Sequence, residues 1–245
     1  MRITVTGATG TQGGAVARLL TERGHEVRRM TRRPNSSTDV YGDFDDPESL
    51  RAAFADADGA FLVTPFGVPA ETEVRQGKAL VDAAADVAHV VFTSATNADR
   101  GTGIPHFDTK AEIEGHLRGH PLWTVLGPAA FMAAGGPVAL PIPADLKLHV
   151  VAPEDIAAMA VLAFEQPERF RDRRIDIASD RLTGPEMAAI RGTEFVEIPL
   201  AEAERYSADL AAMFRHHAEI GLDLDVAALH AEFPEIGWHS YANWI

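Results

Sequence analysis

The chain has 245 residues, of which 46% are hydrophobic and 24% charged, and its formal net charge is −14 at pH 7. This length and composition are typical of a globular protein with a sizeable core. The negative charge argues against nucleic acid or an anionic membrane surface as the main partner, because both attract positive potential. The lack of cysteine excludes disulfides, thiolate zinc sites and a cysteine nucleophile. With no leader sequence and no unbroken apolar span visible, we expect a soluble, cytoplasmic protein.

The first thirty residues predict a strand–helix–strand unit. A strand at Arg2–Thr6 precedes a helix at Thr11–Arg23, and a second strand follows at Glu26–Thr31. Three glycines stand at three-residue spacing in the first turn: Gly7, Gly10 and Gly13. Such glycines permit a sharp turn, close approach of a bound group and tight helix–strand packing, while the helix N-terminus favours a diphosphate. The pattern predicts a dinucleotide site, with a merely structural turn as the alternative.

Short apolar strands and amphipathic helices continue to alternate as far as residue 126. The further strands are predicted at Asp39–Tyr41, Gly59–Val63, His89–Thr93 and Leu122–Leu126, and the further helices at Pro47–Phe54, Glu71–Ala85 and Asp108–Arg118. This alternation predicts a doubly wound parallel sheet of the Rossmann type, an α/β fold, over residues 1–130.

The pattern loosens after residue 130, where glycines and prolines interrupt the apolar run and predict a loop. Order resumes with predicted strands at Leu148–Val151, Arg174–Ala178 and Glu194–Ile198 and helices at Pro153–Phe164 and Thr183–Ile190, before a largely helical tail, Ala201–Ile245. We expect residues 131–245 to form a smaller, irregular substrate-binding part of one globular unit.

Ligands bind such sheets beyond the carboxyl ends of the strands. The segments at these ends should therefore converge on one crevice: Gly7–Gly13, Arg32–Arg33, Thr64–Pro65, Ser94–Asn97 and Pro128–Phe131.

Several blocks resemble the NmrA-like family, an atypical branch of the extended short-chain dehydrogenase/reductase superfamily. They are Thr6–Gly14, Gly42–Leu50, Gly59–Thr64, Glu73–Lys78, Ile104–Lys110 and Val151–Ala157. The resemblance covers roughly residues 1–200 and keeps the order and spacing of the blocks. It implies a core that binds NADP(H) or NAD(H). Members include reductases of quinones and related aromatic carbonyls, tailoring enzymes of aromatic natural products, and redox-sensing regulators without turnover.

The choice of cofactor rests on charge at the end of the second strand. Sites that prefer NAD place a carboxylate there, whereas an arginine accommodates the 2′-phosphate of NADP. Here the strand is followed by Arg32 and Arg33 with no acid, and Arg32 is the better candidate. NADP(H) is favoured and NAD(H) is the alternative; the arginines could also be solvated loop charges. The resemblance implies that Asp43 and Phe44 flank the adenine and that Thr64 passes over the ribose.

The predicted cofactor-binding set is Gly7, Thr9, Gly10, Thr11, Gln12, Gly13, Arg32, Asp43, Phe44, Thr64 and Lys110.

The expected catalytic pair departs from the superfamily pattern, Tyr-x-x-x-Lys. Lys110 fits the lysine, but His106 stands at the tyrosine position. Residues four apart share a helix face, so an imidazole there could still supply a proton beside a cofactor-binding lysine. A pocket-lining histidine without a proton role is the alternative. Ser94, after the fifth strand, is a further catalytic candidate or a strand-end cap.

The substrate side is predicted to contain His106, Phe131, Met132 and His149, which suit a flat apolar ligand or simple core packing. The tail histidines lack metal-binding spacing, so no metal site is expected. The tail aromatics Trp238, Tyr241 and Trp244 either pack onto the body or form a homodimer contact.

These residues predict an NAD(P)H-dependent oxidoreductase acting on a quinone-like or polycyclic aromatic carbonyl, with a reductase or oxygenase-like role in tailoring aromatic natural products. The alternative is a non-catalytic NAD(P)-sensing regulator, which the missing tyrosine favours. Epimerisation of a sugar nucleotide is a weaker third hypothesis, disfavoured by the same absence.

Overall fold

A seven-stranded parallel sheet forms the centre of the molecule in the computed structural model, which describes residues 1–245. Its strands run in the order β3-β2-β1-β4-β5-β6-β10. Their bounds are β1 (Arg2–Val5), β2 (Glu26–Thr31), β3 (Asp39–Tyr41), β4 (Gly59–Leu62), β5 (His89–Thr93), β6 (Trp123–Pro128) and β10 (Arg173–Ile177). The order reverses between β1 and β4, the switch point where such sheets open a ligand crevice. The predicted Rossmann-type α/β fold is confirmed.

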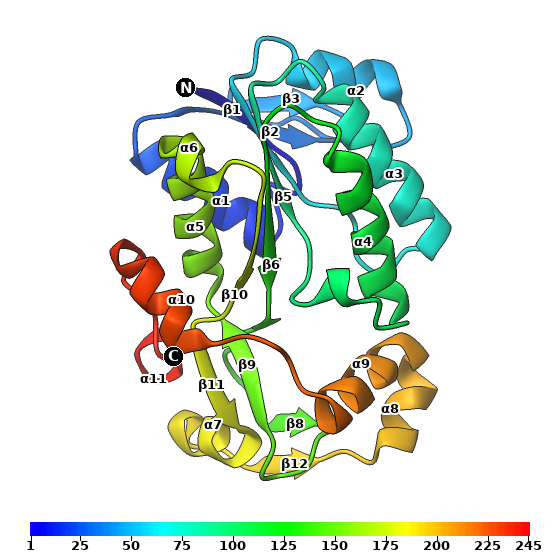
Figure 1. The fold of residues 1–245 in the computed structure, drawn as a ribbon, viewed down its shortest axis with the longest axis vertical. Coiled ribbons are helices and arrows are strands. Elements are labelled where there is room, and N and C mark those ends of the chain that lie inside the picture. Colours follow the sequence, from blue (N-terminus) through cyan, green and yellow to red (C-terminus); the bar gives the residue numbers. More distant parts are fainter.

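Helices cover both faces of this sheet (Figure 1). One face packs against α1 (Thr11–Glu22) and α5 (Pro153–Glu165), and the other against α2 (Pro47–Phe54), α3 (Ala70–Ala83) and α4 (Pro105–Leu117). The central strands β1, β4, β5 and β6 are almost wholly buried and mostly apolar, whereas β2, β3 and β10 carry charged residues and stay partly exposed. None of the helices combines the length and the apolar character that a membrane span requires.

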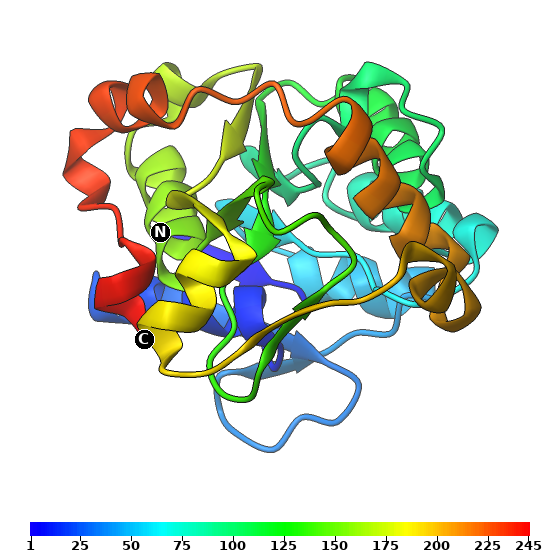
Figure 2. The same cartoon turned by 90° about the horizontal axis from the view of Figure 1, so that it is seen from below.

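The carboxyl ends of the sheet face a lobe built from two small sheets and short helices (Figures 1 and 2). Strands β7 (Ala130–Phe131), β9 (Lys147–Val151) and β11 (Asp180–Thr183) form one sheet, and β8 (Val138–Leu140) pairs with β12 (Phe195–Glu197) in the other. The remaining helices are α6 (Pro167–Phe170), α7 (Gly184–Arg191), α8 (Leu200–Tyr206), α9 (Ala208–Glu219), α10 (Val226–Glu232) and α11 (Tyr241–Trp244). Seen from below, α7 and the α8–α9 pair lie on opposite sides of the lobe (Figure 2).

The predicted division at residue 130 does not separate these layers cleanly. β10 pairs with β6 as the seventh strand of the central sheet, and α5 packs beside α1 on its face. The chain after residue 130 thus builds the lobe and also completes the core, because β6 would otherwise be left as an unpaired edge.

Two local predictions need correction. Residues 130–147 contain the short strands β7 and β8 rather than a loop alone. Helix α4 begins at Pro105 rather than Asp108, since proline at the first helical position loses no hydrogen bond. This earlier start places His106 inside the first turn of α4.

The aromatic tail packs onto the body of the same chain. Tyr241 is buried in the lobe core, and the indole N–H of Trp244 donates to Glu154 at 2.8 Å. Trp238 donates to the carbonyl of Phe233 at 3.0 Å and stacks on His230. Of the two roles considered for these aromatics, the structure shows the intramolecular one.

Because two histidines are buried, we expect the protein to lose stability in acid. Burial lowers the pKa of His89 and of His217 from 6.5 to about 4. The unfolded chain therefore binds more protons between these values, so stability is complete above about pH 6.5 and falls as the pH approaches 4. The difference between the unfolded and folded pKa values corresponds to a loss of roughly 3 kcal/mol in the free energy of unfolding per histidine at pH 4.

Urea unfolding at pH 7, 6 and 5 checks this expectation. His89→Gln keeps a donor for the Thr124 hydroxyl, which lies 2.8 Å from Nε2, and should flatten the pH dependence. An unchanged slope in this variant would assign the acid sensitivity to other groups.

Candidate functional site

The glycine turn has the predicted geometry. Gly7 has a φ of +60°, and the N–H of Gly10 donates to the carbonyl of Gly7 at 2.9 Å. A Cβ on Gly13 would lie 2.4 Å from that same carbonyl oxygen, so only glycine permits this close helix–strand packing. No side chain caps α1. The N-terminus of α1 therefore retains unsatisfied N–H groups and the positive end of its dipole for a bound anion.

A cavity of about 640 Å³ lies beside this turn. It is bounded by the ends of β1 and β2, by the segment after β3 and by the loop after β4. Its lining includes five residues of the predicted cofactor-binding set, namely Gly7, Thr9, Arg32, Asp43 and Phe44, together with Arg33. Thr9 also borders a second hollow with Gly10 and Thr11 on the outer side of α1. Gln12 accepts a hydrogen bond from Thr93 at 2.7 Å, which ties α1 to the end of β5.

Arg32 and Arg33 are the two cations of the cavity. Both are exposed, and neither forms an ion pair with a carboxylate. The nearby Asp45 accepts a hydrogen bond from the Gln76 amide at 2.9 Å and pairs with Arg75 at 2.7 Å, and these bonds hold the pKa of Asp45 below its ordinary value. An unpaired guanidinium at the end of the second strand fits a 2′-phosphate.

Lys110 is partly buried in a polar cluster with Glu73 and Thr64, with 14% of its side chain exposed. Its Nζ lies 2.8 Å from Glu73 Oε1 and donates to the Thr64 hydroxyl, which itself donates to Glu73 at 2.7 Å. Thr109 donates to the other Glu73 oxygen at 2.8 Å. Burial raises the pKa of the Glu73 carboxyl, but Lys110 and the two hydroxyls more than offset this and hold it below its ordinary value. The cluster fixes the position of Lys110 at the end of β4.

His106 projects from the first turn of α4 toward the lobe. Its Nδ1 lies 2.8 Å from the carboxylate of Asp209 on α9, and its ring meets the edges of Phe107 and Phe66. Its Nε2 has no partner and is not sealed from solvent, with 16% of the side chain exposed. A carboxylate only accepts, so Nδ1 carries the proton shared with Asp209 and Nε2 is left free for a ligand.

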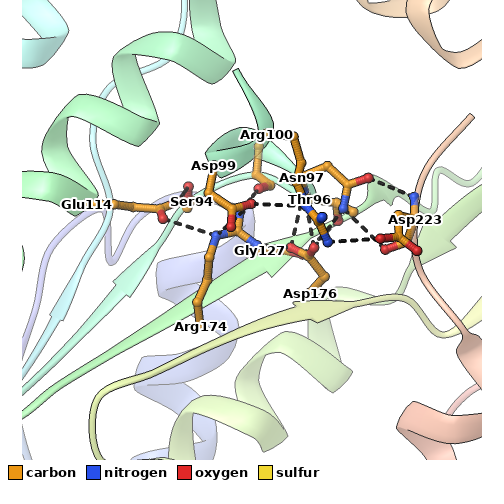
Figure 3. Close-up of polar contacts among 11 residues, drawn as sticks. Ser94, Thr96, Asn97, Asp99, Arg100, Glu114, Gly127, Arg174, Asp176 and Asp223 are labelled. Carbon is orange, nitrogen blue, oxygen red and sulfur yellow. Dashed lines mark hydrogen bonds and ion pairs between the residues drawn. The ribbon is translucent and has the colours of Figure 1, made fainter. Parts of the chain in front are cut away.

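Ser94 belongs to a buried network around Arg174 rather than to the open crevice (Figure 3). Its hydroxyl donates to Glu114, whose other oxygen lies 3.0 Å from Arg174 Nε. Arg174 also pairs with Asp176 and donates to the Ala95 carbonyl at 2.6 Å. This geometry does not support the catalytic role predicted for Ser94, because its only proton is already donated to Glu114.

Asn97 connects this network to the segment that follows α9. Its backbone has a φ of +59°, and its side-chain amide donates to Asp176 at 2.8 Å. The same amide accepts from the backbone N–H of Asp223 at 2.8 Å (Figure 3). A Cβ on Gly127 would lie 2.2 Å from Asp176, so the bare α-carbon of β6 makes room for the network.

The predicted substrate residues do not all face one space. Phe131 on β7 is 40% exposed, whereas Met132 is buried in the lobe core. His149 is buried on β9 with Nε2 unpartnered, and burial lowers its pKa. His217 on α9 is also buried, and neither ring nitrogen has a partner. Burial lowers the pKa of His217, and the charges of His216, His149 and His106 lower it further. Nowhere do three acidic or histidine side chains gather as metal ligands.

Sequence reasoning missed Glu73, Asp209, Phe66 and His217. Glu73 lies in a block already noted, Glu73–Lys78, and its place at the start of that block was the only available signal, because its contact with Lys110 is tertiary. Asp209 and His217 had no such signal, because α9 is brought to α4 only by tertiary packing. Phe66 is 75% exposed, and its significance follows only from its position beside His106.

The sheet order, the switch-point crevice and the glycine turn define a Rossmann-type protein with a dinucleotide-shaped site. A model of the NmrA-like family matches residues 1–197. The chain belongs to the NmrA-like family, and the resemblance inferred from the sequence is confirmed.

Curated relatives share part or most of the chain. It is 36% identical over 136 residues to the NmrA-like family domain-containing oxidoreductase notA of Aspergillus sp. (strain MF297-2), covering 46% of this chain and 40% of that protein. It is 26% identical over 228 residues to the NAD(P)H azoreductase of Xenophilus azovorans, covering 83% and 79%. The chain thus spans about 40% of the length of the NmrA-like oxidoreductase it matches.

Solved structures share the fold at low identity. A nucleoside-diphosphate-sugar epimerase from Staphylococcus aureus superposes with a TM-score of 0.83 at 20% identity, over 99% of both chains. The NADPH complex of the quinone oxidoreductase QOR2 from Escherichia coli gives 0.80 at 20% identity, over 99% of this chain and 97% of that one. The NADP complex of NmrA, a negative transcriptional regulator, gives 0.76 at 18% identity over 98% and 93%.

Proposed function

We propose that this protein is an NAD(P)H-dependent oxidoreductase acting on a quinone-like or polycyclic aromatic carbonyl. The observation that carries the proposal is His106, which stands one helical turn from Lys110 with Nδ1 held by Asp209 and Nε2 free. An imidazole so placed can give a proton to an oxygen atom that is being reduced. Exposed Phe66 beside it offers an aromatic face to a flat substrate.

The residues of the crevice fit a dinucleotide cofactor. The uncapped N-terminus of α1 would hold the diphosphate, Arg32 a 2′-phosphate, and Asp43 and Phe44 the adenosine end. Lys110 and Thr64 would lie toward the nicotinamide ribose. When bound, NAD(P)H supplies a hydride. The names of the azoreductase and of the quinone oxidoreductase, both dependent on reduced nicotinamide cofactors, support this proposal.

Steady-state oxidation of NADPH with a panel of naphthoquinones, anthraquinones and azo dyes tests the proposal. We expect saturable turnover with at least one class of acceptor and none without protein. Tight NADPH binding without turnover across the panel would overturn the proposed oxidoreductase function. The second candidate function, a cofactor-sensing regulator, would then remain. That candidate is favoured by one observation, the histidine at the position where the superfamily pattern has its tyrosine.

Arg32→Ala should discriminate between the two cofactors. Loss of charge-assisted hydrogen bonds to a 2′-phosphate should weaken NADPH binding roughly 10–100-fold and leave NADH binding nearly unchanged. Titration calorimetry with both cofactors measures this, and Arg33→Ala in the same cavity is the matched control. Equal losses for NADPH and NADH would remove Arg32 from 2′-phosphate recognition.

A further inference from the structure

The carboxylate of Asp209 holds His106 by two contacts. It lies 2.8 Å from Nδ1 of the ring and accepts the backbone N–H of His106 at 3.1 Å. The two residues are 103 positions apart in the sequence, on α9 of the lobe and α4 of the core. The two helices meet at the N-terminal end of α4 (Figure 1).

We propose that Asp209 is a positioning residue that fixes the tautomer and orientation of His106, so that the lobe completes the proton-donating group of the core. Its two contacts leave Nε2 as the only nitrogen available to a ligand. Phe107 and Phe66 restrict the ring from the other sides, with centroids 4.7 and 6.3 Å from it. This inference rests on the proposed function, in which His106 gives a proton.

The proton balance explains why a carboxylate is needed. With two electrons and one hydrogen supplied as hydride by a bound nicotinamide cofactor, the carbonyl or quinone oxygen would still need one proton, which Nε2–H of His106 would give. The O–H bond forms as the N–H bond breaks, and the ring returns to the neutral form with its proton on Nδ1. Solvent then reprotonates Nε2. The negative charge of Asp209 stabilises the doubly protonated ring before transfer, as a buried acid does for imidazolium in other histidine–acid pairs.

A purely structural contact between α9 and α4 is the competing explanation. The structural explanation can be distinguished from the positioning role by Asp209→Asn. This variant keeps an oxygen that can accept from both the backbone N–H and Nδ1 of His106, and it removes only the charge. Ser207→Ala is the matched control, since Ser207 caps α9 through Leu210 at 3.2 Å and does not contact His106. The control should lower the melting temperature and leave kcat unchanged.

Two measurements on the full chain with bound NADPH decide whether Asp209 positions His106 or makes only a structural contact. Nitrogen-15 NMR at high pH, where the imidazole rings are neutral, should show the Nδ1–H form of His106 in the wild type and in Asp209→Asn. The His106 signals are identified by their loss in His106→Gln. In Asp209→Ala the ring should change toward the Nε2–H form. Asp209→Asn should also lower kcat on the order of tenfold with KM and NADPH affinity unchanged.

An unchanged tautomer in Asp209→Ala, or a kcat loss no larger than that of Ser207→Ala, would overturn the inference. The NMR measurement needs no turnover. Failure of the inference is therefore distinguishable from failure of the proposed oxidoreductase function.

Discussion

Replacing His106 with phenylalanine should lower kcat with a quinone or aromatic carbonyl by roughly 10²–10⁴-fold, the range associated with a positioned general acid. Phenylalanine keeps an aromatic ring between Phe66 and Phe107 but carries no proton. The affinity for NADPH should change little, because His106 lies toward the lobe, away from the glycine turn and Arg32. Steady-state rates combined with cofactor titration measure both quantities.

His116→Phe is the control for this experiment. It lies on the same helix, is more exposed and pairs with Asp82 at 2.6 Å at the far end of α4. Its substitution should leave the rate unchanged. If His106→Phe retained the wild-type kcat, His106 would line the pocket without a proton role, and water would supply the proton.

Replacing Arg174 with methionine should destabilise the protein by roughly 3–5 kcal/mol, a large part of the stability of a typical domain. Arg174 is the shared cation of three carboxylates, with Nε 3.0 Å from Glu114 and 3.4 Å from Asp99, and a further contact to Asp176. Burial raises the pKa values of Glu114 and Asp176 even with Arg174 present. Without the guanidinium these buried charges would have no counterion.

Urea unfolding at pH 7 measures this loss, and it should shrink as the pH falls and the carboxyls take up protons. Arg171→Met is the matched control, since that exposed arginine pairs only with Glu168 at 2.8 Å and should contribute little. A small loss in Arg174→Met would mean that water replaces the guanidinium at the carboxylates.

The core fold was predictable because local patterns and tertiary structure agree there. β2, β3 and β5 have the predicted bounds, since short apolar strands between amphipathic helices have few alternative placements. β7 and β8 were missed because they are only two and three residues long and lie among glycines and prolines. The pairing of β10 with β6 depends on a long-range contact that no local pattern encodes.

In the candidate site, too, some residues could be predicted from local sequence and others depend on tertiary packing. The glycine turn and Arg32 lie in one continuous βαβ unit, so spacing alone was sufficient to predict them. Ser94 was a candidate from its place after β5, but its hydroxyl direction depends on Glu114 twenty residues later and on Arg174. Asp209 and His217 depend on how α9 packs, which is a property of the lobe as a whole.

Single-turnover oxidation of protein-bound NADPH measures hydride transfer in this crevice to an aromatic carbonyl or quinone. Protein saturated with NADPH, deuterated at C4 on one face or the other, is mixed with a naphthoquinone, and loss of the reduced-nicotinamide absorbance is followed. We predict oxidation far faster than the reaction without protein, and slower with deuterium on one face only. Tightly bound NADPH that is oxidised no faster than in free solution would show that the protein does not catalyse this hydride transfer.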